Sequence, residues 1–136
     1  MALLDTNVLI ELSREMRRGR PARATQKINE LVAQGERLQD AIFTVAELYV
    51  GVSKGNLPAF EKHWVDHCLA LFDVLPFGYS TALIYGELVG ELERRGETIS
   101  EMDALIASVA LECGERMVTR NLKHFQRVPN LKVESF

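Results

Sequence analysis

The sequence has few cysteines, little proline and no long apolar run. Its two cysteines, Cys68 and Cys113, lie far apart and form neither a CxxC pair nor a zinc-binding set with histidine. We expect two reduced, buried or half-buried thiols with no chemical role. No apolar stretch approaches the roughly 20 residues that span a bilayer, and no signal-like segment opens the chain. These absences predict a cytoplasmic protein without a membrane segment.

Nucleotide-binding and zinc-protease motifs are also missing. No glycine-rich loop of the P-loop or dinucleotide type occurs, which excludes kinases, GTPases and NAD-dependent enzymes. His63 and His67 are four residues apart on an expected helix, but neither a third ligand nor an adjacent glutamate completes an HExxH site. We interpret this pair as part of an exposed helix face.

The composition is typical of one globular domain, expected over residues 1–136, since 47% of the residues are hydrophobic and 26% are charged. A chain of this length folds without a metal or a disulfide, so any bound metal serves function. The net charge of −3 argues against a protein that coats nucleic acid. The charge is uneven, however, because residues 14–27 and 116–132 are basic and residues 87–103 are acidic. Taken singly, each such segment also fits a solvated helix face.

Apolar segments alternate with amphipathic ones along the whole chain. They predict strands at 1–4, 41–43, 72–77, 115–119 and 131–133. Helical spacing predicts helices at 8–13, 24–34, 44–55, 58–71, 79–95 and 121–126, with another from Ser100 and a basic loop at 17–23. This alternation indicates an α/β fold of three layers, in which helices cover both faces of a mainly parallel sheet of four to five strands.

Four polar side chains follow the expected strands or begin the helices after them: Asp5, Glu47, Asp103 and Asn121. Open parallel sheets bind ligands outside the carboxyl ends of their strands, so these side chains can converge on one site. A structural alternative exists for each acid. Thr44-x-x-Glu47 and Ser100-x-x-Asp103 match the capping-box signature, and Asp5 can cap the helix after it.

Three carboxylates brought together repel one another unless a cation lies between them. Hard divalent cations take oxygen ligands, and magnesium is usually held by one or two protein carboxylates together with phosphate oxygens. The chain offers no Cys/His set of the kind that zinc prefers. The pattern therefore favours a magnesium-type site.

Four short motifs occur in a fixed order along the chain. They are Leu-Leu-Asp5-Thr6-Asn7, Thr44-x-x-Glu47-Leu48 followed by Gly51, Asp103-Ala104-Leu105-Ile106-Ala107, and Val118-Thr119-Arg120-Asn121 followed by Phe125. In this order and spacing they resemble the PIN-domain ribonucleases, specifically the VapC-type toxins of toxin–antitoxin pairs. The resemblance covers essentially the whole chain and implies a PIN-like three-layer fold.

The resemblance implies a role for each polar residue of these motifs. Asp5, Glu47 and Asp103 would bind Mg²⁺ or Mn²⁺, with Asp5 and Asp103 as direct ligands, while Thr6 and Thr119 orient the cluster. Asn121 would complete the catalytic set at a position where many PIN domains carry a fourth acid. The asparagine removes one negative charge from the side where a second metal would bind. His124, just before Phe125, occupies a position where relatives often have an acid, and we interpret it as a surface residue near the site.

The implied reaction is the metal-dependent hydrolysis of an RNA phosphodiester by a metal-activated water, giving a 3′-hydroxyl and a 5′-phosphate. Glu47 would position or deprotonate that water. Because an acidic site repels RNA, the basic segments are expected to supply affinity for the substrate. The candidate substrate-binding residues are Arg17, Arg18, Arg20, Arg120 and Lys123.

The resemblance also implies a homodimer and an antitoxin whose segment reaches the acidic pocket. Val45, Leu48, Tyr49 and Trp64 are candidates for lining its groove, although Val45 and Leu48 fit the core equally well. Two other functions stay open at this point: a PIN nuclease of RNA maturation or quality control without an antitoxin, and a catalytically silent module that binds RNA or protein.

Overall fold

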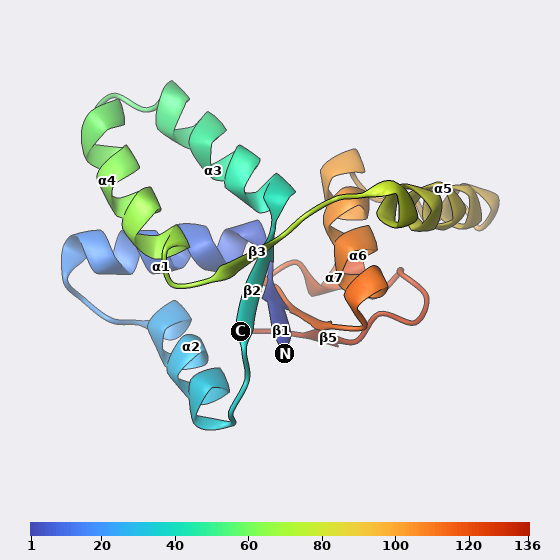
Figure 1. The fold of residues 1–136 in the computed structure, drawn as a ribbon, viewed down its shortest axis with the longest axis horizontal. Coiled ribbons are helices and arrows are strands. Elements are labelled where there is room, and N and C mark those ends of the chain that lie inside the picture. The colour runs from blue at the N-terminus through green and yellow to red at the C-terminus, as the bar shows by residue number, and fades with distance from the viewer.

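The computed structural model describes residues 1–136 and shows one sheet of five strands (Figure 1). The strands are β1 (Ala2–Leu4), β2 (Leu38–Ala41), β3 (Asp73–Leu75), β4 (Arg116–Val118) and β5 (Val133–Glu134). They lie in the order β3-β2-β1-β4-β5, and every neighbouring pair is parallel. The central strand β1 has β2 and β4 as neighbours, with Leu3 opposite both Gln39 and Met117. The predicted parallel sheet is confirmed.

Helices cover both faces of this sheet and make the expected three layers (Figure 1). One face carries α1 (Thr6–Arg18), α2 (Arg23–Ala33), α3 (Ile42–Lys54) and α4 (Pro58–Leu69), and the other carries α5 (Tyr79–Arg94), α6 (Glu101–Cys113) and the short α7 (Leu122–Phe125). Successive residues of a strand point to opposite faces. Thus Ala2 and Leu4 belong to the first core, with Val8 and Leu12, whereas Leu3 belongs to the second.

Helix α1 is longer than the sequence predicts, because it runs to Arg18 rather than to residue 13. Arg17 and Arg18 therefore lie on its last turn and not in a loop. Gly19 ends the helix in the left-handed conformation, at φ 62°. Glu15, the single acid of the basic segment, is buried and accepts hydrogen bonds from the backbone of Ala22, Ala24 and Thr25 at the start of α2.

The second strand and the helix after it differ from the prediction in a way that matters for the site. The strand ends at Ala41, and α3 begins at Ile42, where the sequence indicated a strand over 41–43. Phe43 instead packs edge-on against Phe77, at a ring distance of 5.1 Å. Thr44 consequently lies inside the first turn of α3, and Ala41, which has no capping side chain, occupies the N-cap. The capping box predicted for Thr44 and Glu47 is wrong.

Both cysteines are free, but only one fits the prediction. Cys68 is buried in the first core, where its thiol donates to the carbonyl of Leu9 at 3.7 Å, whereas Cys113 is exposed at the end of α6. None of the helices combines the length and the apolar character that crossing a bilayer requires.

Candidate active site

Asp5 lies where β1 ends and α1 begins, and it performs two tasks. Its Oδ1 accepts a hydrogen bond from the backbone N–H of Thr6 at 2.8 Å, so the predicted helix cap is real. Its Oδ2 accepts hydrogen bonds from the Thr119 hydroxyl at 2.7 Å and from the Asn7 amide at 3.0 Å. The side chain is buried, with 4% of its surface exposed. The capping role and a place in the site are therefore compatible.

Glu47 is held by Thr6 from the neighbouring helix. The Thr6 hydroxyl donates to Glu47 Oε1 at 2.6 Å, and its oxygen lies 3.1 Å from the hydroxyl oxygen of Thr44. Thr44 is completely buried in the first turn of α3. Thr6 and Glu47 were both predicted, whereas the sequence assigned Thr44 only to a cap.

Asp103 lies in the first turn of α6. Its backbone N–H donates to the Ser100 hydroxyl at 3.1 Å, which is the hydroxyl half of the predicted capping box. The carboxylate half is absent, because Asp103 Oδ2 lies instead 3.1 Å from Nδ1 of His124 and 3.5 Å from Nδ2 of Asn121. The carboxylate thus faces the residues that follow β4.

Thr119, directly after β4, ties that strand to Asp5. Besides donating to Asp5, its hydroxyl oxygen accepts the backbone N–H of Asn121 at 2.9 Å. Asn7 adds a second link, because its side-chain oxygen accepts the backbone N–H of Arg120 at 3.1 Å. Asn7 belongs to the first motif, but its polar contacts across the sheet edge depend on the pairing of β1 with β4, which spacing alone does not reveal.

The charges of Asp103 and Glu47 act on the buried carboxylate of Asp5. Burial is the main reason that the pKa of Asp5 rises from 3.8 to about 6, and the charges of Asp103 and Glu47 raise it further, although the Thr119 and Thr6 hydrogen bonds lower it. A cation among them would remove this repulsion. Their oxygen donors match the preference of a hard dication, but no three His, Cys, Asp or Glu side chains already form a closed ligand group.

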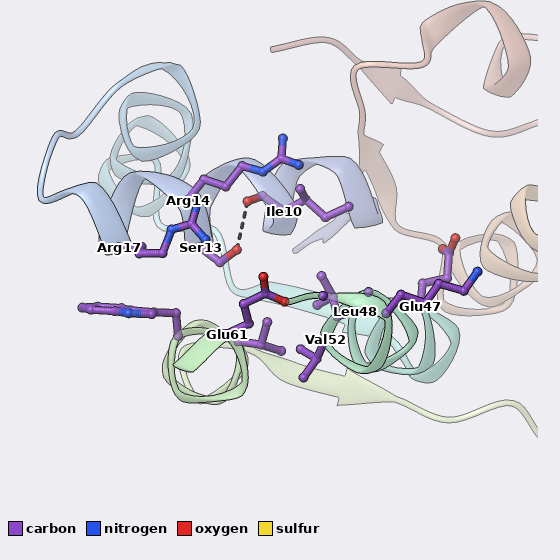
Figure 2. A pocket seen from close by; sticks show the side chains of 13 residues that line it. Ile10, Ser13, Arg14, Arg17, Glu47, Leu48, Val52 and Glu61 are labelled. Atoms are coloured by element: carbon purple, nitrogen blue, oxygen red, sulfur yellow. Dashed lines mark hydrogen bonds between the residues drawn. The ribbon is translucent and has the colours of Figure 1, made fainter. Parts of the chain in front are cut away.

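An open groove of about 410 Å³ leads away from Glu47 between α1 and the α3–α4 pair (Figure 2). Figure 2 shows Arg14 and Arg17 on the α1 side, and Leu48 and Val52 on the α3 side. Trp64 and Glu61 of α4 also line it. Of the predicted groove residues, Leu48 and Trp64 line the groove; Leu48 belongs to the first core as well.

The remaining predicted groove residues, Val45 and Tyr49, are half-buried and outside the lining. Tyr49 packs against the first core and its hydroxyl donates to Asp66 at 2.5 Å.

The predicted substrate-binding side chains all reach solvent. Arg17 and Arg18 are exposed at the end of α1, Arg20 lies in the loop after it, and Lys123 is exposed on α7. Arg120 is exposed beside the site and its guanidinium lies 5.1 Å from the centre of the Phe136 ring. His63 and His67 are exposed on α4, as predicted, with ring centres 5.4 Å apart.

Comparison with known proteins matches residues 2–131 to the model of the PIN domain. The chain belongs to the PIN domain family. Over 107 residues, which are 79% of this chain and 80% of the relative, it is 36% identical to Ribonuclease VapC2 of Rickettsia felis. It is also 28% identical over 134 residues, 98% of this chain and 96% of the relative, to a protein of Shigella flexneri named tRNA(fMet)-specific endonuclease VapC.

Solved structures agree with this assignment. The VapBC2 complex of Rickettsia felis, crystallised with a DNA fragment from its promoter, contains a chain that superposes with a TM-score of 0.88 and 30% identity. The alignment covers 99% of this chain and 98% of that one. The resemblance expected from the sequence is confirmed, and these comparisons support the toxin endoribonuclease function that it implies.

Proposed function

We propose that the chain is a metal-dependent endoribonuclease that acts as the toxin of a toxin–antitoxin pair. The observation that carries this proposal is the meeting of Asp5, Glu47 and Asp103 at the carboxyl edge of the sheet, where burial, followed by the charges of Asp103 and Glu47, raises the pKa of Asp5. A carboxylate that only caps a helix has no need of other carboxylates beside it. A cation site brings several together, because the bound ion offsets the repulsion between them. The relatives named as ribonucleases supply the class of reaction.

The chemistry follows from the environment of each side chain. A bound Mg²⁺ or Mn²⁺ ion would polarise a phosphate oxygen and lower the pKa of a bound water. Asp5 and Asp103 would hold the ion, and Thr119 and Asn7 fix the orientation of the Asp5 carboxylate. Glu47, which accepts a hydrogen bond from the Thr6 hydroxyl, would position the attacking water or take its proton.

RNA is the proposed substrate, held outside the acidic centre. Phosphate contacts from Arg17, Arg18, Arg20, Arg120 and Lys123 offset the repulsion between the carboxylates and the RNA backbone, and they provide affinity without sequence choice. The chosen RNA and its cleavage site depend on contacts to bases.

An antitoxin segment is the proposed occupant of the groove beside Glu47. Leu48, Val52 and Trp64 offer an apolar surface to a helix or an extended peptide, and Arg14 and Arg17 can pair with its acidic side chains. Because Glu47 closes one end, a basic side chain of the segment that reaches it would occupy the catalytic centre. The similar solved structures of VapBC complexes support an antitoxin as the partner.

We further propose that residues 1–136 form one domain, and that this domain forms a homodimer in the cytoplasm. Four large apolar side chains around the β3 edge and the start of α5 reach solvent and are candidates for the contact between copies: Ile42, Val74, Tyr79 and Leu83.

Thermal unfolding with and without metal tests the proposed site. Mg²⁺ or Mn²⁺ should raise the Tm of the wild-type protein by several degrees, because an ion that binds only the folded state stabilises it. Asp5→Asn should lose most of this shift, while His67→Ala on α4 should retain it. Equal shifts in the wild type and Asp5→Asn would remove Asp5 from the metal site.

A further inference from the structure

Three separate contacts hold Arg120 beside the catalytic centre. Its backbone N–H donates to Asn7 Oδ1 at 3.1 Å, and the Asn7 amide in turn donates to the Asp5 carboxylate. Its guanidinium lies 3.4 Å from Glu11 Oε1 and, on another side, over the ring of Phe136 at 5.1 Å from the ring centre. Both the backbone and the side chain of Arg120 are therefore fixed relative to Asp5.

Phe136 reaches this place because β5 lies beside β4. The carbonyl of Glu134 accepts the backbone N–H of Thr119 at 3.0 Å, so the chain leaves β5 at the same edge of the sheet as Thr119. The Phe136 side chain is half-buried and packs against the first core. The ring is thus an anchored surface, whereas the Arg120 side chain above it is 50% exposed.

Glu11 does not neutralise the arginines around it. Its Oε1 lies 3.4 Å from Nη1 of Arg14 and 3.4 Å from Nη1 of Arg120. Because one carboxylate faces two guanidiniums, a positive charge remains among the three groups. This remaining charge lies next to the acidic centre, where RNA meets the strongest repulsion.

An aromatic ring holds a guanidinium in a way that leaves it free to bind phosphate. The ring contacts the flat face of the group and takes up none of its five N–H donors, which lie in the plane. Phosphate oxygens can accept two of these donors side by side. A side chain already held in one orientation also loses less conformational entropy when the ligand binds.

We propose that Phe136 is a positioning residue, which holds the Arg120 guanidinium ready for an RNA phosphate next to the acidic centre. This rests on the proposed nuclease function, because RNA is the ligand. Arg120 then sets the path of the RNA backbone past Asp5, since its own backbone is tied to that carboxylate through Asn7.

A double-mutant cycle on RNA binding tests this role. The probe is a short single-stranded RNA with a fluorescent label, bound to the full chain in EDTA so that it is not cleaved. Phe136→Leu keeps the apolar contact with the core but removes the ring, and it should weaken binding about two- to fivefold. Arg120→Ala should weaken binding at least about fivefold, and adding Phe136→Leu to it should cause no further loss.

Two further variants separate the ring from its bulk. Phe136→Trp should bind RNA as the wild type does, because tryptophan offers the strongest face to a cation. Phe60→Leu, at an exposed phenylalanine of α4, should also leave binding unchanged. In nuclear magnetic resonance spectra, the side-chain N–H proton of Arg120 should move downfield in Phe136→Leu, because the ring current is lost.

Wild-type affinity in Phe136→Leu, an Arg120 proton signal that does not move, or a further loss in the double variant would overturn the role of Phe136. The double variant also separates positioning from stability, because a weakened fold would reduce binding in the Arg120→Ala background as well. Equal affinities of the wild type and Arg120→Ala would overturn the phosphate contact itself. None of these results touches the proposed nuclease function, which cleavage of cellular RNA by the wild type tests separately.

Discussion

A buried carboxyl group without a hydrogen-bond partner lies at Asp40, on strand β2. Its side chain is completely buried on β2, and neither carboxylate oxygen has a hydrogen-bond partner. Burial, followed by the charge of Asp73, raises its pKa from 3.8 to about 7. The folded state therefore binds a proton that the unfolded state releases, so the contribution of Asp40 to stability is most favourable below about pH 4 and is lost as the pH rises toward 7.

Asp40→Asn should remove this dependence. The shift from 3.8 to about 7 corresponds to at most about 4 kcal/mol of unfolding free energy. The variant should have a Tm about 5 °C or more above the wild type at pH 8 and a similar Tm at pH 4, as measured without metal. Asp73→Asn, which removes the exposed neighbour, should show only a small change. A Tm difference that does not vary with pH would contradict the raised pKa.

At the scale of single residues, the sequence predicted the acidic residues better than the polar residues that hydrogen-bond around them. Asp5 and Asp103 are identifiable because Asp5 caps α1 directly after β1 and Asp103 lies in the first turn of α6. Thr44 and Asn7 become support residues only through contacts with partners 38 and 112 residues away. The contact of His124 with Asp103 likewise depends on how α7 lies against α6.

At the scale of elements, the end of α1 presents the main basic surface. The last turn of α1 carries Arg17 and Arg18, and the loop after it carries Arg20. Reversing all three to glutamate should weaken RNA binding by 10-fold or more, roughly as expected from three lost phosphate contacts, and should flatten its salt dependence.

A control reverses two charges at the opposite edge of the sheet, to be compared with the reversal of Arg17 and Arg18 alone. Arg37 and Lys132 are exposed and lie just before β2 and β5, at the amino ends of those strands. Their reversal to glutamate should change binding far less. RNA affinity measured at several salt concentrations checks both variants. Equal losses of affinity in the two variants would show that RNA binding responds only to the net charge of the protein.

A substitution in helix α3 can test antitoxin binding to the groove without disturbing the fold. Gly51 lines the groove, and a Cβ added there would meet no atom within 4 Å. Gly51→Ala should stabilise the protein by about 0.5–1 kcal/mol, since alanine favours a helix interior. Gly51→Trp should fold as well but weaken antitoxin binding strongly by filling the groove. Calorimetric titration with the antitoxin measures this, and unchanged affinity would place the antitoxin elsewhere.

The element boundaries show where sequence patterns fail. The apolar run at 41–43 has the composition of a strand, but β2 pairs with β1 only as far as Gln39 and with β3 as far as Ala41, where it ends. Its aromatic residue then finds burial against Phe77 from the first turn of a helix. Helix α1 was predicted too short because its continuation is amphipathic and basic, with Met16 packed on the core and the arginines in solvent.

At the scale of the whole molecule, the alternation of strands and helices was sufficient to predict the fold. Five parallel strands place the ends of β1 and β4 side by side, which brings Asp5 to Thr119 although 114 residues separate them. The groove was harder to predict, because it lies between helices whose angle depends on packing. Its continuity with Glu47 places the proposed antitoxin contact and the proposed chemistry on one surface.

The most direct test of the account is cleavage of total cellular RNA by the purified protein, freed of any antitoxin, with Mg²⁺ or Mn²⁺. The wild type should give specific fragments with 5′-phosphates, and both EDTA and Asp5→Asn should abolish them. Intact RNA with a metal-bound, folded wild-type protein, or fragments that persist in Asp5→Asn, would contradict the proposed metal-dependent nuclease.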